Sequence, residues 1–427
     1  MAVKIGICGT GTVGGGCLDI IKNHAEDFKR HFGIDIELAK VCSRNPEQAY
    51  SHGVGKLFTT DFHDVINDPD IDIVVEVMGG TGAAREAVLG ALKNGKNVVT
   101  ANKALMATYG KEVMEAAAAA GKEVAFEASV GGGIPIIGPL KHSLIANRID
   151  SVMGIVNGTT NYMLTRMVES GLSYAEALKE AQDLGYAEAD PSADVDGFDA
   201  AAKIAILASI AFNTRVTLDD VHTEGISGLD AIDLEAAADM GYCVKLLAIA
   251  HRREEGIDVR VHPTMLPLDH QLAKVNGVFN AIYVTGDAVG ESMFFGEGAG
   301  AGAAASAVMG DVLEVARHVQ QGVGPIVGCT CTDSLPILPI EDLNTKYYVR
   351  FKVADRTGVL AAIANVFARH QVSLFSVVQR GCVDGKSVDL VYVTHTANEQ
   401  NLEDVLEEIA QLDDVLRAQP SLIRVED

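Results

Sequence analysis

The feature that most limits the fold of this chain is a glycine-rich turn near the N-terminus, set between a strand and a helix. Residues 3–8 alternate apolar and small residues, as a buried strand does, and GTGTVG follows at 9–14. Apolar residues then recur at helical spacing through 17–21. This order is that of a dinucleotide-binding turn, in which amides at the start of a helix hold phosphates. The alternative is a plain glycine-rich turn.

The residues of this turn have separate predicted tasks. Gly9 permits the turn, Gly11 lets a pyrophosphate approach the backbone, and Gly14 allows the helix to pack close to the strand. The cofactor-binding residues predicted within the motif are Gly9, Thr10, Gly11, Thr12, Val13 and Gly14.

The end of the next predicted strand bears on the choice of coenzyme. That strand, 36–42, is followed by Ser43 and Arg44, where an NAD site usually has an acidic residue for the ribose 2′-hydroxyl. A hydroxyl and a guanidinium suit a 2′-phosphate, so NADP(H) is preferred, with NAD(H) as the alternative. Arg44 could instead stack on adenine or point into solvent.

Strands and helices keep alternating up to a strand at 123–128, which predicts a doubly wound parallel sheet of the Rossmann type. Ligands bind such sheets at the carboxyl ends of the strands, where Gly79 and Thr100 lie. Lys103 opens a helix, where its charge opposes the dipole, and this favours a functional role. Three glycines after Glu127 could offer carbonyls to a hard cation, or form a flexible crossover.

Carboxylates and one lysine gather in GYAEADPSADVDGFDAAAK, residues 185–203. One helix should stop at Gly185, and an almost wholly apolar helix should begin after Gly197. Asp199 and Lys203 are four residues apart and therefore share a face of that second helix. Such a pair is usually solvated, but a buried apolar helix behind it predicts that its polar end faces a cleft.

Composition excludes several classes of protein. A chain of 427 residues should form two or three domains, and its net charge of −24 argues against a nucleic-acid partner. There is no run of eighteen apolar residues and no signal peptide, so we expect a cytoplasmic protein without a membrane partner. The seven scattered cysteines fit reduced thiols, and Cys329 and Cys331 have the wrong spacing for a common zinc pair.

The chain resembles the homoserine dehydrogenases over nearly its whole length. The matching phrases, in order, are GTGTVG (9–14), TANK (100–103), EASVGGGIP (127–135), GIVNGTTNY (154–162), GYAEADP and GFDAAAK (185–203), EGI (224–226) and GYCVKLLA (241–248). The resemblance implies NADPH-dependent reduction of L-aspartate 4-semialdehyde to L-homoserine, a step shared by threonine, methionine and isoleucine synthesis.

The resemblance also implies site residues. Lys203 matches the proton donor, and Lys103 matches a second lysine that touches cofactor and substrate. The implied substrate-binding residues are Glu188, Asp199, Gly185 and Asp194, of which Glu188 and Asp199 would hold the amino group. The implied ligands of a monovalent cation (Na⁺ or K⁺) are Glu127 and the backbone oxygens of Val130, Gly132 and Ile134. Gly300 could contact the nicotinamide side, although Ala303 and Ala304 depart from the family's pattern, so that this loop is expected to be looser.

The remaining chain predicts two further domains. Strands near 149–156, 259–263 and 280–284 suggest an α+β catalytic domain with an open sheet at 134–303, which should pair as a homodimer or homotetramer. We expect the helix 304–320 to pack back on the nucleotide domain at 1–133. Three prolines mark a linker at 325–346.

The C-terminal segment 347–427 shows a βαββαβ order, with two strands around Cys382, and a D-x-x-G-V-L turn at 355–360. It resembles the ACT domain, which binds amino acids between paired copies, with Asp355 and Gly358 at the usual effector loop. The resemblance predicts feedback inhibition by L-threonine; the alternative is a pure dimerisation module.

Two other functions are alternatives to this enzyme. One is another NADP-linked semialdehyde or hydroxy-acid dehydrogenase, and a second is a catalytically silent amino-acid sensor. An acylating semialdehyde dehydrogenase would need an activated cysteine, which the carboxylate block lacks. No kinase-like segment precedes residue 1, so a monofunctional enzyme is expected.

Overall fold

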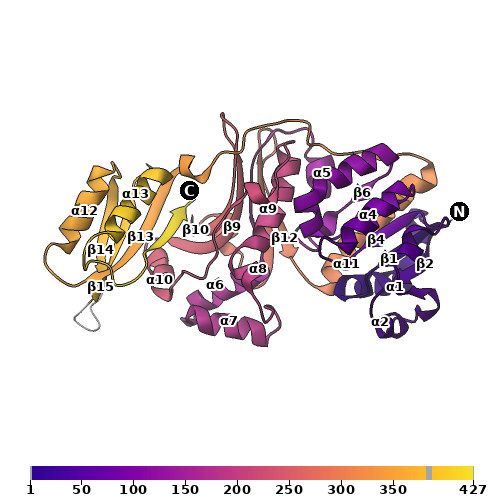
Figure 1. Cartoon of the computed structure of the whole chain (residues 1–427), viewed down its shortest axis with the longest axis horizontal. Helices are drawn as coiled ribbons and strands as arrows, with labels where there is room; N and C mark the ends of the chain where they lie inside the picture. The colour runs from indigo at the N-terminus through magenta and orange to yellow at the C-terminus, as the bar shows by residue number, and fades with distance from the viewer. Residues whose placement is uncertain (1, 381–386, 427) are drawn as a thin grey trace.

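The computed structural model describes residues 2–380 and 387–426, which form three parts in a row (Figure 1). An N-terminal parallel sheet lies at one end, a long mixed sheet runs from the middle to the other end, and helices cover both. This arrangement confirms the expected fold class. Within the described residues no helix is long and apolar enough to span a bilayer.

The N-terminal sheet has six parallel strands in the order β3-β2-β1-β4-β5-β6. Its strands are β1 (Val3–Cys8), β2 (Ile36–Cys42), β3 (Phe58–Thr59), β4 (Ile73–Glu76), β5 (Asn97–Thr100) and β6 (Val124–Ala125). Its helices are α1 (Thr12–Phe32), α2 (Pro46–Ser51), α3 (His63–Ile66), α4 (Ala83–Lys93) and α5 (Lys103–Ala120). The strand order reverses between β1 and β4, and such a switch point leaves a crevice for ligands at the carboxyl ends. The predicted strand 123–128 is wrong beyond Ala125, because a 3₁₀ turn at Glu127–Ser129 ends it.

Helix α11 (Ala301–Gln321) packs on this sheet although it follows the central part in sequence. Its apolar residues, including Val308 and Val312, share a core with β1 and α1. The two helices come close because Gly16 has no side chain: a Cβ there would lie 2.7 Å from the carbonyl oxygen of Ala301. The helix begins three residues earlier than expected, so Ala303 and Ala304 lie in its first turn and not in a loose loop.

The central part contributes five of the strands in the long sheet, with one short strand at its side. These are β7 (Ile149–Ile155), β9 (Tyr242–Arg252), β10 (Ile257–Pro267), β11 (Phe279–Gly286), β12 (Gly290–Glu297) and the short β8 (His222–Thr223). Its helices are α6 (Gly158–Ser170), α7 (Tyr174–Asp183), α8 (Ser192–Val195), α9 (Phe198–Ala211) and α10 (Ala231–Asp239). Helix α9 is apolar on every side because it lies between this sheet and α5. Strand β9, which has eleven residues and lies between β7 and β10, is not among the strands predicted from the sequence.

The C-terminal part follows the predicted βαββαβ order. Its elements are β13 (Asn344–Ala354), α12 (Val359–Arg369), β14 (Leu374–Arg380), β15 (Ser387–Thr394), β16 (Ala397–Asn398), α13 (Glu399–Ala410) and β17 (Ser421–Val425). Cys382, around which two strands were expected, lies outside the described residues. The expected linker is not a free tether, because Ile337 bridges to Ile257 at the start of β10.

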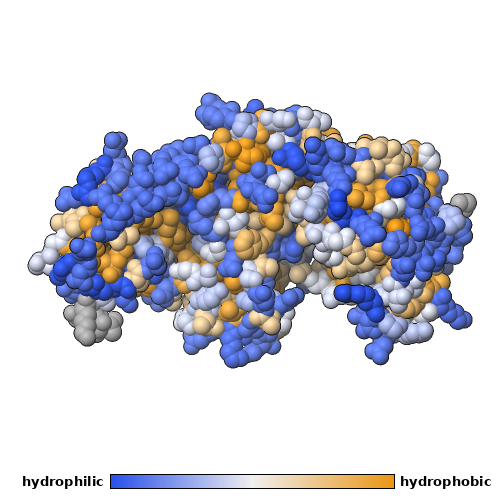
Figure 2. Space-filling model, viewed as in Figure 1, coloured by the Kyte–Doolittle hydropathy of each residue, from blue (hydrophilic) through white to orange (hydrophobic). Residues whose placement is uncertain are grey.

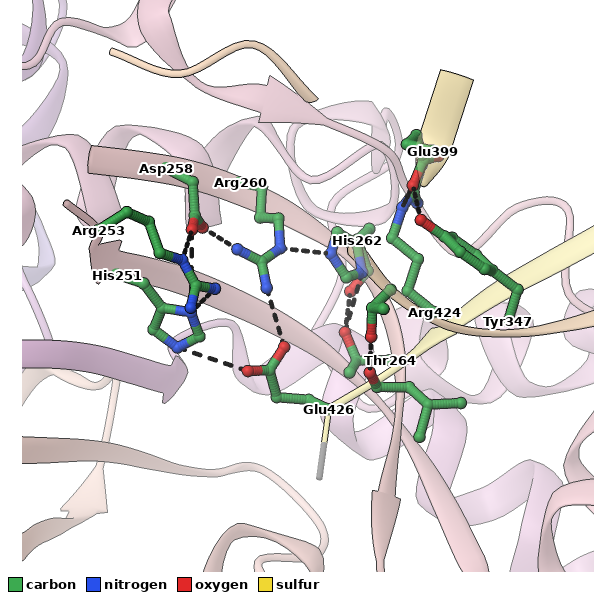
Figure 3. A network of polar contacts seen from close by, with 12 residues as sticks. His251, Arg253, Asp258, Arg260, His262, Thr264, Tyr347, Glu399, Arg424 and Glu426 are labelled. Atoms are coloured by element: carbon green, nitrogen blue, oxygen red, sulfur yellow. Dashed lines mark hydrogen bonds and ion pairs between the residues drawn. The ribbon is translucent and has the colours of Figure 1, made fainter. Parts of the chain in front are cut away.

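The last strand joins the central and C-terminal parts into one sheet. β17 pairs with β13 on one side and with β10 on the other, through Thr264 and Met265. Around this seam lies a buried network of ion pairs and hydrogen bonds (Figure 3). There Arg260 of β10 binds Glu426, and Arg424 of β17 binds Glu399 at the start of α13. The C-terminal part is therefore attached to the central part through its own final strand.

Candidate active site

The glycine-rich turn has the geometry that a pyrophosphate site requires. Gly9 has a φ of 112°, which favours glycine, and a Cβ there would lie 2.5 Å from the carbonyl oxygen of Val77. A Cβ on Gly14 would lie 2.0 Å from the carbonyl oxygen of Gly9, so α1 can approach β1 only with glycine at this position. Gly11 has no atom within 4 Å of its would-be Cβ. Space therefore opens in front of the helix N-terminus, where amides attract phosphate.

Thr10 and the residues after β2 line the same end of the sheet. The hydroxyl of Thr10 donates to Ser43 Oγ at 2.6 Å, and its oxygen also lies 2.9 Å from Gln48 Oε1. Arg44, the residue on which the coenzyme prediction rests, is exposed beside them.

A buried carboxylate that sequence reasoning missed shapes the next two loops. Glu76, at the end of β4, is fully buried and accepts hydrogen bonds from Thr100 Oγ1 at 2.7 Å and from the amide of Met78 at 2.8 Å. Asn102, which caps α5, donates to the carbonyl of Gly80 at 2.7 Å. Glu76 thus fixes the two loops that precede Lys103. A carboxylate in an otherwise apolar strand was the one signal that could have revealed it.

Lys203 and Asp199 face each other at the N-terminal end of α9, as their spacing predicted. Lys203 Nζ donates to Asp199 Oδ2 at 2.7 Å and to the carbonyl of Val156, at the end of β7, at 2.6 Å. Lys103, from α5 of the N-terminal part, forms an ion pair with the other oxygen of Asp199. The side chain of Lys203 is 11% exposed and that of Lys103 is 45% exposed, so Lys103 lies on the open side.

Asn157 also belongs to the cluster of Lys203 and Asp199, although sequence reasoning did not assign it to the site. Its oxygen caps α6 by accepting from the amide of Thr160 at 2.9 Å. Its Nδ2 donates to Asp194 Oδ1 at 2.7 Å and to Asp199 Oδ2 at 2.9 Å. One side chain therefore holds both carboxylates while it fixes the start of a helix. Its place in a helix-capping turn was visible in the sequence, but its partners were not.

Burial and charge act in opposite directions in this cluster. Burial alone would raise the pKa of Asp199, but the ammonium groups of Lys203 and Lys103 outweigh it and hold that pKa well below its usual range. Burial lowers the pKa of Lys203, and Lys103 lowers it further, while Asp199 opposes both effects. A lysine with a lowered pKa gives up its proton more readily at neutral pH.

The remaining implied substrate residues are less closely placed. Glu188 is exposed, and of its groups the backbone carbonyl accepts a hydrogen bond from Gln182 Nε2 at 3.1 Å. Gly185 is also exposed and has a φ of 78°, which ends the turn after α7. Within the described residues the structure therefore brings Lys203, Lys103 and Asp199 together but leaves Glu188 outside their hydrogen bonds.

The glycine run after β6 has two predicted roles, a cation site or a crossover. Both oxygens of Glu127 accept backbone amides, those of Ile136 at 2.6 Å and Ile137 at 2.8 Å on one oxygen and that of Gly138 at 2.6 Å on the other. Gly132 has a φ of 57°, and a Cβ there would lie 2.5 Å from the carbonyl of Gly298. The loop is thus a packed junction against the turn that leads to Gly300 and α11.

Gly300 has a φ of 124° and stands at the N-terminus of α11. The molecular surface is indented between the lobe of α6–α8 and the N-terminal part (Figure 2). Lysines from both sides of this boundary meet on Asp199. Such an arrangement can bind a carboxylate or an oxyanion between two ammonium groups and deliver a proton to it.

Three family models match successive parts of the chain. The homoserine dehydrogenase NAD-binding domain matches residues 9–127, the homoserine dehydrogenase domain matches 135–313, and the ACT domain matches 347–414.

Known proteins match all or most of the chain. A homoserine dehydrogenase of Synechocystis is 47% identical over 435 residues, with all of both chains covered. The crystal structure of a homoserine dehydrogenase from Thiobacillus denitrificans superposes with a TM-score of 0.94 at 43% identity, covering 100% of this chain and 99% of that one. A hyperthermophilic archaeal homoserine dehydrogenase in complex with NADPH gives a TM-score of 0.64 at 29% identity, covering 74% of this chain and 98% of that one.

Proposed function

This chain belongs to the homoserine dehydrogenase family, NAD(P)-dependent oxidoreductases that act on a CH–OH group, and from that premise we propose that it reduces L-aspartate 4-semialdehyde to L-homoserine with Lys203 as the proton donor. The observation that supports this role is the meeting of Lys203 and Lys103 on Asp199 at the boundary of the two parts. The reaction would serve threonine, methionine and isoleucine synthesis.

The residues of this chain have distinct parts in the proposed reaction. The turn at Gly11 and the loops held by Glu76 fit a dinucleotide that, when bound, supplies hydride to the aldehyde carbon. Val156 and Asp199 accept two of the three N–H groups of the Lys203 ammonium, which leaves a third for the aldehyde oxygen. As negative charge grows on that oxygen, Lys203 transfers a proton to it. Lys103 adds a second positive charge, and Asp199 and Glu188 would bind the α-ammonium.

We expect the purified protein to oxidise NADPH when L-aspartate 4-semialdehyde is added, and to form L-homoserine in equal amount. The fall in absorbance of the reduced nicotinamide measures the NADPH consumed, and chromatography measures the L-homoserine formed. A semialdehyde without the α-amino group is the matched control, because it offers no ammonium to Asp199. Turnover of the control as fast as of the amino acid would contradict the proposed substrate.

The coenzyme preference depends on Arg44. With Ser43 and the exposed Arg44 at the end of β2, a 2′-phosphate would gain a charge-assisted hydrogen bond. Arg44→Ala should therefore raise KM for NADPH by about tenfold, since a bond to a charged group contributes about 1.5–3 kcal/mol, and leave KM for NADH nearly unchanged. Steady-state kinetics with both coenzymes measure this. An equal change in both KM values would assign Arg44 to adenine stacking instead.

The loop after β6 could hold a monovalent cation through its backbone. The carboxylate of Glu127 is occupied by three amides, so this residue would contribute its carbonyl. The carbonyls of Val130, Gly132 and Ile134 lie in the same tight loop, and carbonyl oxygens are ligands that such ions accept. A cation there would stiffen the contact between this loop and the turn at Gly298.

Regulation by L-threonine would use the C-terminal part. Asp355 is exposed, and Gly358 caps α12 with a φ of 92° and open space around its would-be Cβ. The end of this part reaches the active site, because Arg424 binds Glu224 and the amide of Ile226 donates to the carbonyl of Val195 at 2.8 Å, beside Asp194. The last strand of this part thus has direct contacts toward the substrate residues, through which a change in the C-terminal part would act.

Millimolar L-threonine should inhibit turnover of the native protein, and Asp355→Ala should remove that inhibition. A carboxylate at the loop is positioned to bind the α-ammonium of the amino acid, so its loss should weaken threonine binding in calorimetry by about tenfold or more. Arg369→Met, on the exposed face of α12, is the matched control and should keep full inhibition. If threonine neither bound nor inhibited the native protein, this part would be a dimerisation module.

We also propose a homodimer or homotetramer. The two strands at the ends of the long sheet expose large apolar side chains: Met293 and Phe295 on β12, and Val377 and Val378 on β14. Exposed edge strands with apolar side chains favour pairing with another copy.

A further inference from the structure

Two cysteines lie next to both helices that carry the active-site lysines. Cys329 and Cys331 belong to the segment that leaves α11 and crosses toward the C-terminal part. With Met106 of α5 and Ile206 of α9 they line a small cavity of about 30 Å³. The thiol of Cys331 lies 3.5 Å from the carbonyl of Ser209 on α9. Any covalent change here would act between α5, which begins at Lys103, and α9, which carries Lys203.

Cations face the sulfur of Cys329. Arg215, just after α9, donates from Nη2 to Cys329 Sγ at 3.1 Å. Lys141 lines the same cavity and donates to the carbonyl of Val327 at 3.4 Å. Cys329 is itself exposed. Positive charge and solvent access together are the conditions in which a cysteine becomes a reactive thiolate.

The second cysteine completes the pair. A tight turn, in which the amide of Thr332 donates to the carbonyl of Thr330 at 2.8 Å, places Cys331 at its centre. Hydrogen bonding between the two thiols lowers the pKa of Cys329 and raises that of Cys331. Burial has the opposite effect on the cysteines of the N-terminal part, raising the pKa of Cys17 to about 12.

We propose that Cys329 and Cys331 form a peroxide-reactive dithiol that closes to a disulfide and so changes the packing of α5 against α9. The Cys329 thiolate attacks hydrogen peroxide: an S–O bond forms, the O–O bond breaks and hydroxide leaves, so that sulfur is oxidised and peroxide is reduced. The Cys331 sulfur then displaces the oxygen from the sulfenic acid; an S–S bond forms, and water leaves with the thiol proton. A thiol reductant reverses the change.

The geometry permits this closure and gives it a consequence. The Cα atoms of residues two apart are separated by at most about 7 Å, at the upper end of the range that a disulfide spans. Closure draws the Cys331 sulfur toward Cys329 and away from Ser209 on α9. It also removes the negative charge that holds Arg215, whose guanidinium packs 3.2 Å from the would-be Cβ of Gly110 on α5.

The first test is selective alkylation at pH 6 of the intact protein. Iodoacetamide should label Cys329 before Cys8, Cys17, Cys42 or Cys243, as read by peptide mass spectrometry. Arg215→Met should slow labelling of Cys329 about tenfold, equivalent to roughly one unit of pKa, and Arg215→Lys should restore most of it. Equal labelling of all cysteines, or no effect of Arg215→Met, would overturn the proposal.

The second test is oxidation by hydrogen peroxide. The tryptic peptide 318–346 of the native protein should lose two hydrogens, that of Cys331→Ser should gain oxygen instead, and that of Cys329→Ser should not change. Turnover of the native protein should fall about tenfold and recover with dithiothreitol, since a misplacement on the order of 1 Å can cost about a hundredfold. Cys329→Ser should resist peroxide. A complete disulfide without loss of turnover would refute the link to the catalytic helices.

Discussion

Replacing Lys203 with methionine should lower kcat for aldehyde reduction by about 10²–10⁴-fold, the usual contribution of a positioned general acid. Methionine has nearly the length of lysine, so the space between Val156 and Asp199 stays filled. Because Lys203 lies at the carboxylate cluster and not at the turn around Gly11, NADPH should bind almost as well as to the native protein. Coenzyme fluorescence measures binding, and single-turnover kinetics measure the chemical step.

Lys245→Met is the matched control for this substitution. Lys245 is a second buried lysine of the central part, on β9, and donates to the carbonyl of Val275 at 2.6 Å and to Asn161 Oδ1 at 3.1 Å. Its loss should lower stability without a comparable loss in the rate of the chemical step. If Lys203→Met kept full turnover, or if both variants lost the chemical step equally, Lys203 would not be the proton donor.

The pH dependence of the native protein follows from the same lysine. Lys203 must carry a proton to donate it, and burial lowers its pKa from the usual range. The rate of reduction should therefore fall as pH rises through this lowered pKa, below the pH at which an ordinary lysine loses its proton. In Lys203→Met this alkaline limb should be absent.

Local patterns were enough to predict the strand, the glycine-rich turn and the helix at the N-terminus. Strand β1, the turn at Gly9 and Gly14, and helix α1 follow one another in sequence, and each residue's role depends on its immediate neighbours. The pairing of Asp199 with Lys203 was also predicted, because four residues make one turn of a helix.

The rest of the active site depends on contacts between distant segments. Lys103 reaches Asp199 only because α5 packs on α9. Asn157 donates to Asp194 only because the end of β7 places it beside the segment that holds Asp194. Glu76 was part of an apolar strand, and no local pattern shows that its partner would be Thr100. The resemblance to known enzymes supplied Lys103 as a site residue; physical reasoning alone supplied only its unusual place at a helix start.

The join between the central and C-terminal parts, that is, the pairing of β17 with β10, was also not predictable from the sequence, because its partners are distant in the chain. Both parts read as separate sheets, yet β17 pairs with β10 across residues 160 positions apart, as in Thr264 with Arg424. Arg424 then meets Glu224, 200 residues earlier. A predicted linker at 325–346 gave no sign of this, since the connection is made by the last strand and not by the segment between the parts.

Replacing Arg424 with methionine should destabilise the join by about 3–5 kcal/mol, the usual cost of removing one partner from a buried ion pair. Arg424 is 3% exposed and binds two carboxylates in forked geometry, that of Glu399 (Figure 3) and that of Glu224. Its Nη1 and Nη2 donate to Glu224 at 2.9 and 2.8 Å, and its Nε donates to Glu399 at 2.9 Å. Without Arg424, the nearly fully buried Glu399 keeps a hydrogen bond from Tyr347 but loses its counter-charge.

Hydrogen exchange of the β17 amides measures the local effect in a protein whose parts need not unfold together. Protection of these amides should fall by about 10²–10⁴-fold, since each 1.4 kcal/mol is about tenfold. Arg369→Met is the matched control: its pair with Glu408 is largely exposed, so its removal should cost only about 0–1 kcal/mol. Unchanged protection of β17 in Arg424→Met would show that strand pairing alone holds the join.

The loss of β17 protection caused by Arg424→Met should also depend on pH. Burial would raise the pKa of Glu224, but hydrogen bonds from His222 and Arg424 outweigh it and hold that pKa well below its usual range. The stability that this pair contributes is therefore present above the unfolded pKa of a glutamate and is lost as pH falls through the lowered folded value. In Arg424→Met the pair between Arg424 and Glu224 is absent, so the variant lacks this contribution at every pH. The difference in β17 protection between native protein and variant should thus narrow as pH falls, and a difference that stayed constant would show that Arg424 acts there by packing and not by charge.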